Sequence, residues 1–454
     1  MQQLIDSLEE LRISHEVAAF GLLIIEKDAV VTLSTRGVAN RDSDEPISDD
    51  AVFRIGSISK LFTGLVAAQL SADNVLDLDT PIKRWPVNDA YTNPWTDKHP
   101  VTTAQLLEHT AGLTDLSKPE WDYSDPRQLP LGKTLRLHPD ARTAQWAPGL
   151  HYSYSNAGAG LAAYVMELAT DKPYEQLLQE IVLTPLAMNS TSALPPSGNR
   201  LAQGYNTDGR TPIPYWHQIF RPFGAINSTL ADMSKLLRVL LNKGTLDGQR
   251  FYTEAVIERT ELLTTSLASR NGLQHGYGLG NYNWYRDGIE FHGHGGDADG
   301  YLSRMGYNRT TNSGYFLVIT AFQPATLKKM TTLVEKYLIR DAASPPAAAD
   351  WSLTDDDIAA ITGNYERTTR RFPTSKSTSK GAVLRIFSRD SNALYYQHGE
   401  KKPVRLLPVT DNLFRHENEV TATLFIGAGE DGDIYFQSGS DNFRRISATE
   451  TGGE

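Results

Sequence analysis

Apolar and polar residues follow patterns that change along the chain. Leucines recur at helical spacing in Met1–Val17, while Phe20–Lys27 and Val30–Arg36 are apolar, β-branched runs separated by Asp28-Ala29. Apolar residues three to four positions apart indicate a helix, and short β-branched runs around a turn indicate a hairpin. The pattern therefore predicts a helix followed by the first two strands of a sheet.

The centre of the chain, residues 57–241, is patterned as helices and loops. Five segments carry apolar residues near a period of 3.6: Leu61–Leu70, Gln105–Glu108, Ala157–Leu168, Tyr174–Leu183 and Leu230–Leu241. Strand patterns return in three segments before a last apolar helix: Tyr277–Tyr285, Tyr301–Tyr307, Gly314–Phe322 and the helix Ala325–Leu338. We expect one antiparallel sheet assembled from both ends of this region, with a helical block inserted between them.

The final hundred residues follow a different pattern. Asp341–Asp350 (DAASPPAAAD) has the small-residue composition of a linker, and seven short β-patterned runs follow between residues 365 and 446. Such runs, separated by turns, are typical of a small antiparallel barrel. The chain is therefore predicted to have an α+β domain at residues 1–345 and a β-barrel domain at 346–454.

Composition narrows the function classes. The chain has 454 residues, 40% of them hydrophobic, and a net charge of -10 without a block of basic residues, so nucleic acid is not an expected partner. It has no cysteine, which excludes disulfides and thiol nucleophiles. No apolar stretch reaches membrane-spanning length. The N-terminus has no signal-peptide pattern, so a cytoplasmic protein and a processed periplasmic or secreted form both stay open, as does the oligomeric state.

The sharpest local feature is Ser57-Ile58-Ser59-Lys60 ahead of an apolar helix. Residues i and i+3 lie on one helix face, so the Ser57 hydroxyl and the Lys60 amine are expected side by side. Burial and a helix N-terminus both lower the pKa of a lysine, and a neutral amine can act as a base toward serine. The competing interpretation is a helix-capping serine followed by a surface lysine.

Two further segments favour the first interpretation. Tyr154-Ser155-Asn156 stands in a turn before a helix, and His294-Gly295-Gly296 lies between strand patterns. The order Ser57-x-x-Lys60, Tyr154-x-Asn156, His294-Gly295-Gly296 resembles the three motifs of the serine β-lactamase and penicillin-binding-protein superfamily, in the variant with His-x-Gly in place of Lys-Thr-Gly. The resemblance extends over residues 15 to 340 or so.

The resemblance implies a fold. It is that of class C β-lactamases: an antiparallel sheet flanked by helices, with a helical subdomain and the site in the groove between them. The C-terminal domain resembles the lipocalin-like barrels that some D-aminopeptidases and related penicillin-binding-protein homologues carry. In those relatives the barrel shapes access to the site, so we expect residues of the barrel to approach the cleft.

The resemblance also implies roles for residues. Ser57 is expected to be the nucleophile, and Lys60 and Tyr154 to share the proton transfers. Asn156 is expected to hydrogen-bond the acyl amide of the substrate. His294 stands where β-lactamases have a lysine that orders the tyrosine and the substrate carboxylate.

The third motif adds backbone groups and carboxylates. Gly295 and Gly296 are expected to let a substrate backbone approach closely. The amides of Ser57 and Asp297 are implied as the oxyanion hole. Asp297 and Asp299 are expected either to attract a substrate ammonium at the rim of the cleft or to cap turns.

These features predict a serine hydrolase that forms an acyl-enzyme. The expected substrate is a small molecule or a peptide with an ester, peptide or amide bond, and D-amino-acid substrates are included. An imidazole, with a pKa of about 6.5, holds a carboxylate less firmly than an ammonium does. A β-lactamase is therefore a less favoured alternative. A non-catalytic penicillin-binding or peptidoglycan-binding protein is the other.

Three further patterns are expected to be structural. His292, His294, Asp297 and Asp299 are metal-capable types, but no other ligand cluster accompanies them, so we predict no metal site. His109 is expected to be a buried structural histidine rather than a base. Gly427–Gly432 matches G-x-G-x-x-G, but a strand follows it, so a hairpin loop is predicted and no cofactor is expected.

Overall fold

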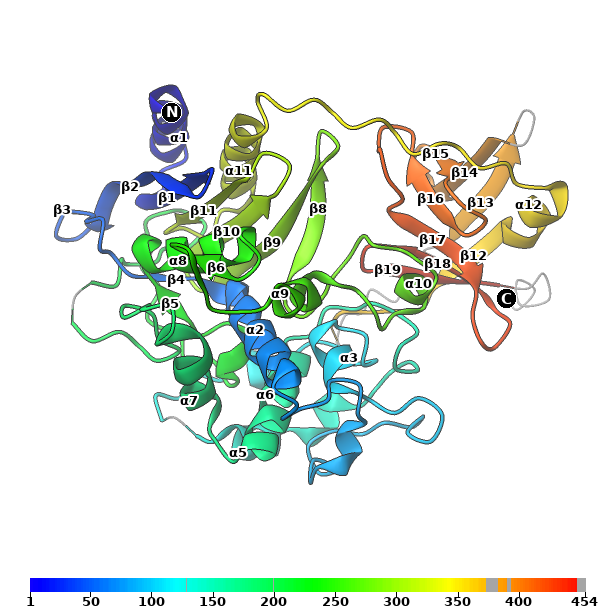
Figure 1. Ribbon diagram of the computed structural model, residues 1–454, viewed down its shortest axis with the longest axis horizontal. Helices are drawn as coiled ribbons and strands as arrows, with labels where there is room; N and C mark the ends of the chain where they lie inside the picture. Colours follow the sequence, from blue (N-terminus) through cyan, green and yellow to red (C-terminus); the bar gives the residue numbers. More distant parts are fainter. Residues whose placement is uncertain (128, 199, 373–382, 390–392, 447–454) are drawn as a thin grey trace.

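The computed structural model describes residues 1–127, 129–198, 200–372, 383–389 and 393–446, and Figure 1 shows how their helices and strands are arranged. The last part of the predicted barrel domain, residues 447–454, lies outside these described residues. The chain forms a mixed region of sheet and helices followed by a closed barrel. The predicted α+β fold with a C-terminal barrel is thus confirmed.

A seven-stranded antiparallel sheet organises the first region. Its strands, in spatial order, are β3 (Glu45–Pro46), β2 (Ala29–Asn40), β1 (Ala19–Glu26), β11 (Ser313–Ile319), β10 (Tyr301–Asn308), β9 (Ile289–Ala298) and β8 (Tyr282–Arg286). The N-terminal hairpin pairs with the last strand of the region, β1 against β11. The sheet is therefore assembled from both ends of the region, as the pattern predicts.

Helices cover both faces of the sheet (Figure 1). On one face α1 (Gln2–Ser14) and α11 (Pro324–Leu338) pack against apolar side chains such as Leu22 and Ile24. On the other face α8 (Leu230–Leu241) packs against the alternate residues of β1. Because successive residues of a strand point to opposite faces, a strand buried on both faces is apolar throughout, as β1 is.

The helical block lies below the sheet in Figure 1. Its helices and short pairs are α2 (Ser59–Ala72), α3 (Thr103–Leu107), α4 (Lys118–Trp121), α5 (Leu131–Leu135), α6 (Asn156–Thr170), α7 (Tyr174–Leu178) with a π-helical turn (Gln179–Leu183), α9 (Glu254–Glu261), α10 (Leu267–Arg270), β4 (Phe53–Arg54) with β5 (Asn227–Ser228), and β6 (Thr245–Leu246) with β7 (Gln249–Arg250). Single 3-10 turns stand at Gly56–Ile58, Ile82–Arg84, Pro139–Arg142 and Arg221–Phe223.

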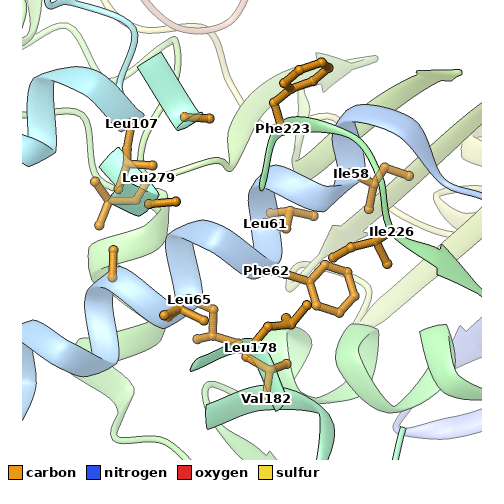
Figure 2. Close-up of a cluster of buried hydrophobic side chains, with 14 of the residues drawn as sticks. Ile58, Leu61, Phe62, Leu65, Leu107, Leu178, Val182, Phe223, Ile226 and Leu279 are labelled. Carbon is orange, nitrogen blue, oxygen red and sulfur yellow. The ribbon is translucent and has the colours of Figure 1, made fainter. Parts of the chain in front are cut away.

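The helix α2 runs through the centre of this block. Nearly every residue of its first three turns is buried, on all sides of the helix. Figure 2 shows its apolar side chains, Phe62 and Leu65 among them, in one cluster with Leu178 and Val182. A helix that is apolar all round is stable only inside a core. This packing fixes the position of the residues at its N-terminal end.

Removing Phe62 tests that packing. The side chain is fully buried, and deletion of a buried phenyl ring typically costs about 3–5 kcal/mol because a cavity remains. Phe62→Ala is therefore expected to lower the thermal midpoint by several degrees in a melting curve. Val75→Ala, at a side chain that is 46% exposed just after the same helix, is the control and is expected to melt like the wild type. Equal melting of the two variants would contradict this account of α2.

The barrel closes on itself with its own core. Its strands are β12 (Gly363–Arg367), β13 (Leu384–Arg389), β14 (Ala393–His398), β15 (Val404–Pro408), β16 (Leu413–His416), β17 (Leu424–Ala428), β18 (Ile434–Ser438) and β19 (Asp441–Arg445). Strand β12 pairs with both β13 and β19, which completes the closure. The short helix α12 (Asp355–Ile361) precedes the barrel and packs onto its core.

The barrel docks on the first region beside α10. Leu267 and Leu273 of that segment share a buried apolar cluster with Leu413, Phe425 and Tyr435 of the barrel. Separation of the two parts would expose these apolar side chains to water, which is unfavourable. The barrel therefore has a fixed place next to the sheet and the helical block.

Besides the two-residue strands β3 to β7, the strands β9 and β16 escaped the sequence pattern. The third motif does not lie between strands but within one, β9, where glycine and histidine hide the strand because neither has high β-propensity. The strand predicted from Tyr277 begins only at Tyr282. The four-residue strand β16 was missed because it is too short to show a period.

Candidate active site

The sequence motifs converge on one cleft. It has a volume of about 1060 Å³ and is lined by residues of the sheet, the helical block and the barrel, among them Ser57, Tyr154, Asn156 and His294. Lys60 lies directly behind Ser57, with its side chain buried. The predicted site residues are therefore brought together, although they come from segments up to 240 positions apart.

Ser57 stands at a sharp entry into α2. It belongs to the 3-10 turn Gly56–Ile58 that leads directly into the helix. Gly56 has a φ of +53°, a left-handed conformation that side chains rarely adopt. A Cβ there would also lie 2.6–2.7 Å from backbone atoms of Asp297. Glycine thus lets the Ser57 segment lie directly against the backbone of β9.

Lys60 is buried and fully engaged. Its Nζ lies 3.2 Å from Ser57 Oγ, and it donates to Asn156 Oδ1 at 2.7 Å and to the Phe223 carbonyl at 2.8 Å. Burial lowers the pKa of Lys60 well below its usual value, with Asp115 opposing the shift and Arg371 reinforcing it. The surface-lysine interpretation is therefore wrong, because the side chain is only 1% exposed.

Tyr154 contributes a neutral phenol. Burial raises its pKa well above the usual value, and a hydrogen bond with Ser57 works against that rise. The centre of its ring lies 4.9 Å from Lys60 Nζ and 4.3 Å from the centre of the His109 ring, with the two rings tilted by 40°. His109 is buried, as predicted, and its Nδ1 accepts the N–H of Ser155, which holds the turn that carries Tyr154.

Asn156 is held from two sides. Its Oδ1 accepts from Lys60, while its Nδ2 donates to Asp115 Oδ2 at 3.2 Å and its backbone N–H donates to Asp115 Oδ1 at 2.9 Å. Asn156 also lines the cleft, and its Nδ2 has two N–H groups, one of which bonds Asp115. The amide therefore holds the lysine, and its contact with a substrate stays a prediction.

His294 is a neutral imidazole. Its Nδ1 contacts the carbonyl of Gly295, which can only accept, so Nε2 accepts the hydroxyl of Tyr277 at 2.5 Å. Burial lowers the pKa of His294 well below its usual value, and the positive charge of Lys60 adds to that effect. Its ring lies 6.4 Å from that of Tyr154. The hydrogen-bond partner of His294 is thus Tyr277 rather than Tyr154.

The two glycines of the third motif lie in close contact with other residues of the protein. A Cβ at Gly296 would lie 1.9 Å from the carbonyl oxygen of Ile55, and one at Gly295 would lie 2.9 Å from the guanidinium of Arg304. Glycine at these two positions thus makes room for Ile55 and Arg304. The close approach of a substrate backbone stays a prediction.

Asp297 and Asp299 both line the cleft. Asp299 lies 3.8 Å from the buried guanidinium of Arg54, whereas no cation among the described residues lies within ion-pair distance of Asp297. Neither carboxylate accepts a backbone N–H in the described part of the chain, so the turn-capping alternative has no hydrogen bond to support it. Burial raises the pKa of Asp297, while the positive charges of Arg371, Arg304 and Lys60 act in the opposite direction.

The barrel contributes one wall of the cleft. The loop after β12, from Thr369 to Phe372, and the turn Gly439–Asp441 line it. Arg371 reaches furthest: its guanidinium lies 4.8 Å from the ring of Tyr154, and its Nε donates to Asp115 at 3.0 Å. The expectation that barrel residues approach the cleft is confirmed.

Sequence reasoning missed four groups of this site: the Asp115 carboxylate, the Phe223 carbonyl, the Tyr277 hydroxyl and the Arg371 guanidinium. Asp115 stands between apolar and small residues, a setting in which a buried carboxylate needs partners, and that signal was available. The other three carry no motif. Their places follow only from the tertiary fold.

The glycine-rich pattern, the metal-capable residues and the apolar helices were also compared with the structure. Gly427–Gly432 spans the end of β17 and the turn to β18, the hairpin loop that was predicted. Within the described ranges, no three His, Asp or Glu side chains gather closely enough to hold a metal ion. In the same part of the chain, no helix has the length and apolar character needed to cross a bilayer.

Comparisons with known proteins show the family and the fold. Penicillin-binding protein 4 of Amycolatopsis lactamdurans is 25% identical over 392 residues, which cover 80% of this chain and 96% of that protein. The octameric penicillin-binding protein homologue from Pyrococcus abyssi superposes with a TM-score of 0.62 at 19% identity, over 98% of this chain and 99% of the other.

A third similarity covers the first region only. The D-amino acid amidase from Ochrobactrum anthropi SV3 superposes with a TM-score of 0.60 at 21% identity, over 76% of this chain and all of that one. The model of the Beta-lactamase family matches residues 2–338, about three quarters of the chain. The protein therefore belongs to the Beta-lactamase family.

Proposed function

We propose that the protein is a serine hydrolase that is acylated at Ser57 by an ester, peptide or amide substrate. One observation carries the proposal. A neutral lysine amine has two N–H donors and one lone pair, and Asn156 Oδ1 and the Phe223 carbonyl take both donors of Lys60. The lone pair is then left for the hydroxyl of Ser57, 3.2 Å away.

The chemistry follows from that arrangement. Ser57 Oγ attacks the substrate carbonyl carbon as its proton passes to Lys60, and the carbonyl oxygen becomes an oxyanion. The amides of Ser57 and Asp297 are the proposed donors to this oxyanion, and each such donor typically contributes about 3 kcal/mol in the transition state. Tyr154, a neutral phenol, then protonates the leaving group as its bond to carbon breaks, and Lys60 returns a proton to Tyr154. Water hydrolyses the acyl-enzyme.

The charges of the cleft narrow the substrate class. A neutral His294 offers no ammonium to a β-lactam carboxylate, which disfavours a β-lactamase. The carboxylates of Asp297 and Asp299, which both line the cleft, favour a substrate with an ammonium group close to the scissile bond. The amide of an amino acid carries that group, and the similarity to a D-amino acid amidase supports this class. Amino-acid amides, D-amino-acid amides among them, are therefore the preferred candidates.

His294 is expected to matter for the reaction more than for folding. His294→Ala should lower the rate of acylation about tenfold, because the ring between Tyr277 and the cleft is lost. The thermal midpoint should fall by a few degrees only. The matched control is His292→Ala, two residues earlier on β9 and 3.6 Å from Glu290, which should keep the wild-type rate. An unchanged rate in the His294 variant would remove this residue from the site.

A substrate panel tests the proposal as a whole. Activated esters, cephalosporins and amides of L- and D-amino acids are incubated with the enzyme and with Ser57→Ala, and turnover is followed by product release. We expect turnover of esters and of amides with a free amino group. Preferential turnover of cephalosporins would favour the β-lactamase alternative. No turnover and no adduct with any substrate would favour a non-catalytic binding protein.

A further inference from the structure

We propose that Arg371 of the barrel and Asp115 of the helical block are positioning residues that hold Asn156, and through it Lys60, in the reactive arrangement. The inference rests on the proposed function of Ser57 and Lys60. It gives the barrel a second role: besides forming a wall of the cleft, the barrel positions the groups that react.

Arg371 and Asp115 contact each other twice. The Nε of Arg371 donates to Asp115 Oδ2 at 3.0 Å, and the backbone N–H of Asp115 donates to the Arg371 carbonyl at 2.6 Å. The two residues are 256 positions apart, and the pair joins the barrel to the helical block. A side-chain bond and a backbone bond together fix both the position and the direction of the guanidinium.

Asp115 is a fully buried carboxylate. It accepts from the backbone and the side chain of Asn156, and from the backbone N–H of Leu116 at 2.9 Å. A buried charge is costly unless a counter-charge accompanies its hydrogen bonds. Arg371 is the one cation among the described residues that lies within ion-pair distance of it. The barrel therefore supplies the counter-charge of this buried carboxylate.

The Asp115 carboxylate sets the direction of the Asn156 amide. A carboxylate only accepts, so it selects the Nδ2 side of the amide and turns Oδ1 toward Lys60. With the amide reversed, Lys60 would face an N–H group and lose one of its two acceptors. The chain of contacts from Arg371 to Lys60 thus decides whether the lysine lone pair faces Ser57.

The same pair bears on the charge of Lys60. The titratable and charged groups that act on Lys60 or contact it come from several elements: Asp115, Arg371, Asp297, His109, His294 and Tyr154. The positive charge of Arg371 lowers the pKa of Lys60, and the negative charge of Asp115 raises it. Loss of the Arg371 charge is therefore expected to move the acid limb of the pH–rate profile to higher pH, and loss of the Asp115 charge to move it to lower pH.

The test follows the rate at which a fluorophosphonate probe labels Ser57, measured against pH. Arg371→Met should lower the plateau rate about tenfold, the usual effect of a lost hydrogen bond to a charged group. It should also move the acid limb of the profile to higher pH. Asp115→Asn should lower the plateau similarly and move the acid limb to lower pH. Arg371→Lys keeps the charge, so its acid limb should stay near that of the wild type.

The control is Arg405→Met, which breaks an exposed ion pair of the barrel with Glu417, outside the cleft. It should label like the wild type at every pH. If Arg371 only docks the barrel, its variants will melt at lower temperature but label with the wild-type pH profile, and the proposal is overturned. Acid limbs that move in the same direction in Arg371→Met and Asp115→Asn would also overturn the proposal. A wild-type protein that is not labelled at all would instead refute the proposed function, and this inference with it.

Discussion

Ser57→Ala is expected to lower kcat/KM for every substrate of the protein by about 10⁴-fold or more, since loss of the nucleophile of an acyl-transfer enzyme leaves only binding and oxyanion stabilisation. Ser57 is the hydroxyl that faces both the Lys60 amine and the Tyr154 phenol. The measurement is steady-state hydrolysis of p-nitrophenyl acetate and of an amino-acid amide.

The matched control is Ser59→Ala, two residues on. Ser59 Oγ donates to the Gly56 carbonyl and accepts the N–H of Ile226, so it supports the turn without facing the cleft. Ser59→Ala should fold less stably but keep most of its turnover per folded molecule. If Ser57→Ala retains wild-type esterase turnover, the proposed mechanism fails.

Lys60→Met is expected to have the second largest effect, a loss of about 10³-fold to 10⁴-fold in kcat/KM, because the base is removed while the buried volume is kept. Methionine is apolar and adaptable in a packed site. The serine and the lysine act as one unit, so the double variant with Ser57→Ala should be no slower than the slower single variant. Lys235→Met, at a partly exposed lysine of α8 that pairs with Asp232, is the control and should keep full activity. Additive losses in the double variant would show that the two residues do not act together.

The lysine also predicts a pH dependence. Burial lowers the pKa of Lys60, so kcat/KM should fall on the acid side as the amine takes up a proton and can no longer accept one from Ser57. An unfolded lysine keeps a pKa of about 10.4. Between the folded and the unfolded pKa the unfolded chain binds more protons, so burial of Lys60 costs stability that grows as the pH falls through this window. Lys60→Met should therefore melt no lower than the wild type at pH 7, and a much lower midpoint would contradict this sign.

Local periodicity allowed the layout of strands and helices and the Ser57–Lys60 pair to be predicted, and the resemblance of the motifs implied the fold and the remaining site residues. The apolar run after Lys60 indicated a buried helix, and the three-residue spacing placed Ser57 beside the amine. The strand β1 was visible because it is apolar on both faces. Seven barrel strands were visible because turns separate short β-branched runs.

The rest depends on contacts between distant segments. Strand β9 was hidden because its glycines, chosen for the close approach of Ile55 and Arg304, have no β-propensity. The pairing of Asp115 with Arg371 joins residues 256 positions apart, and no spacing rule reaches that far. His294 was recognised from its motif, but its bond to Tyr277 follows from the way β9 passes the loop before β8.

The central claim is that Ser57 becomes acylated with Lys60 as its base. The most direct measurement is intact-mass detection of the adduct formed with a fluorophosphonate probe, followed by peptide mapping, in the wild type and in Lys60→Met. The account predicts one adduct per chain, on the peptide that carries Ser57, formed rapidly in the wild type and at least a thousandfold more slowly in the variant. An adduct on any other residue, or equal labelling rates in the two proteins, would contradict it.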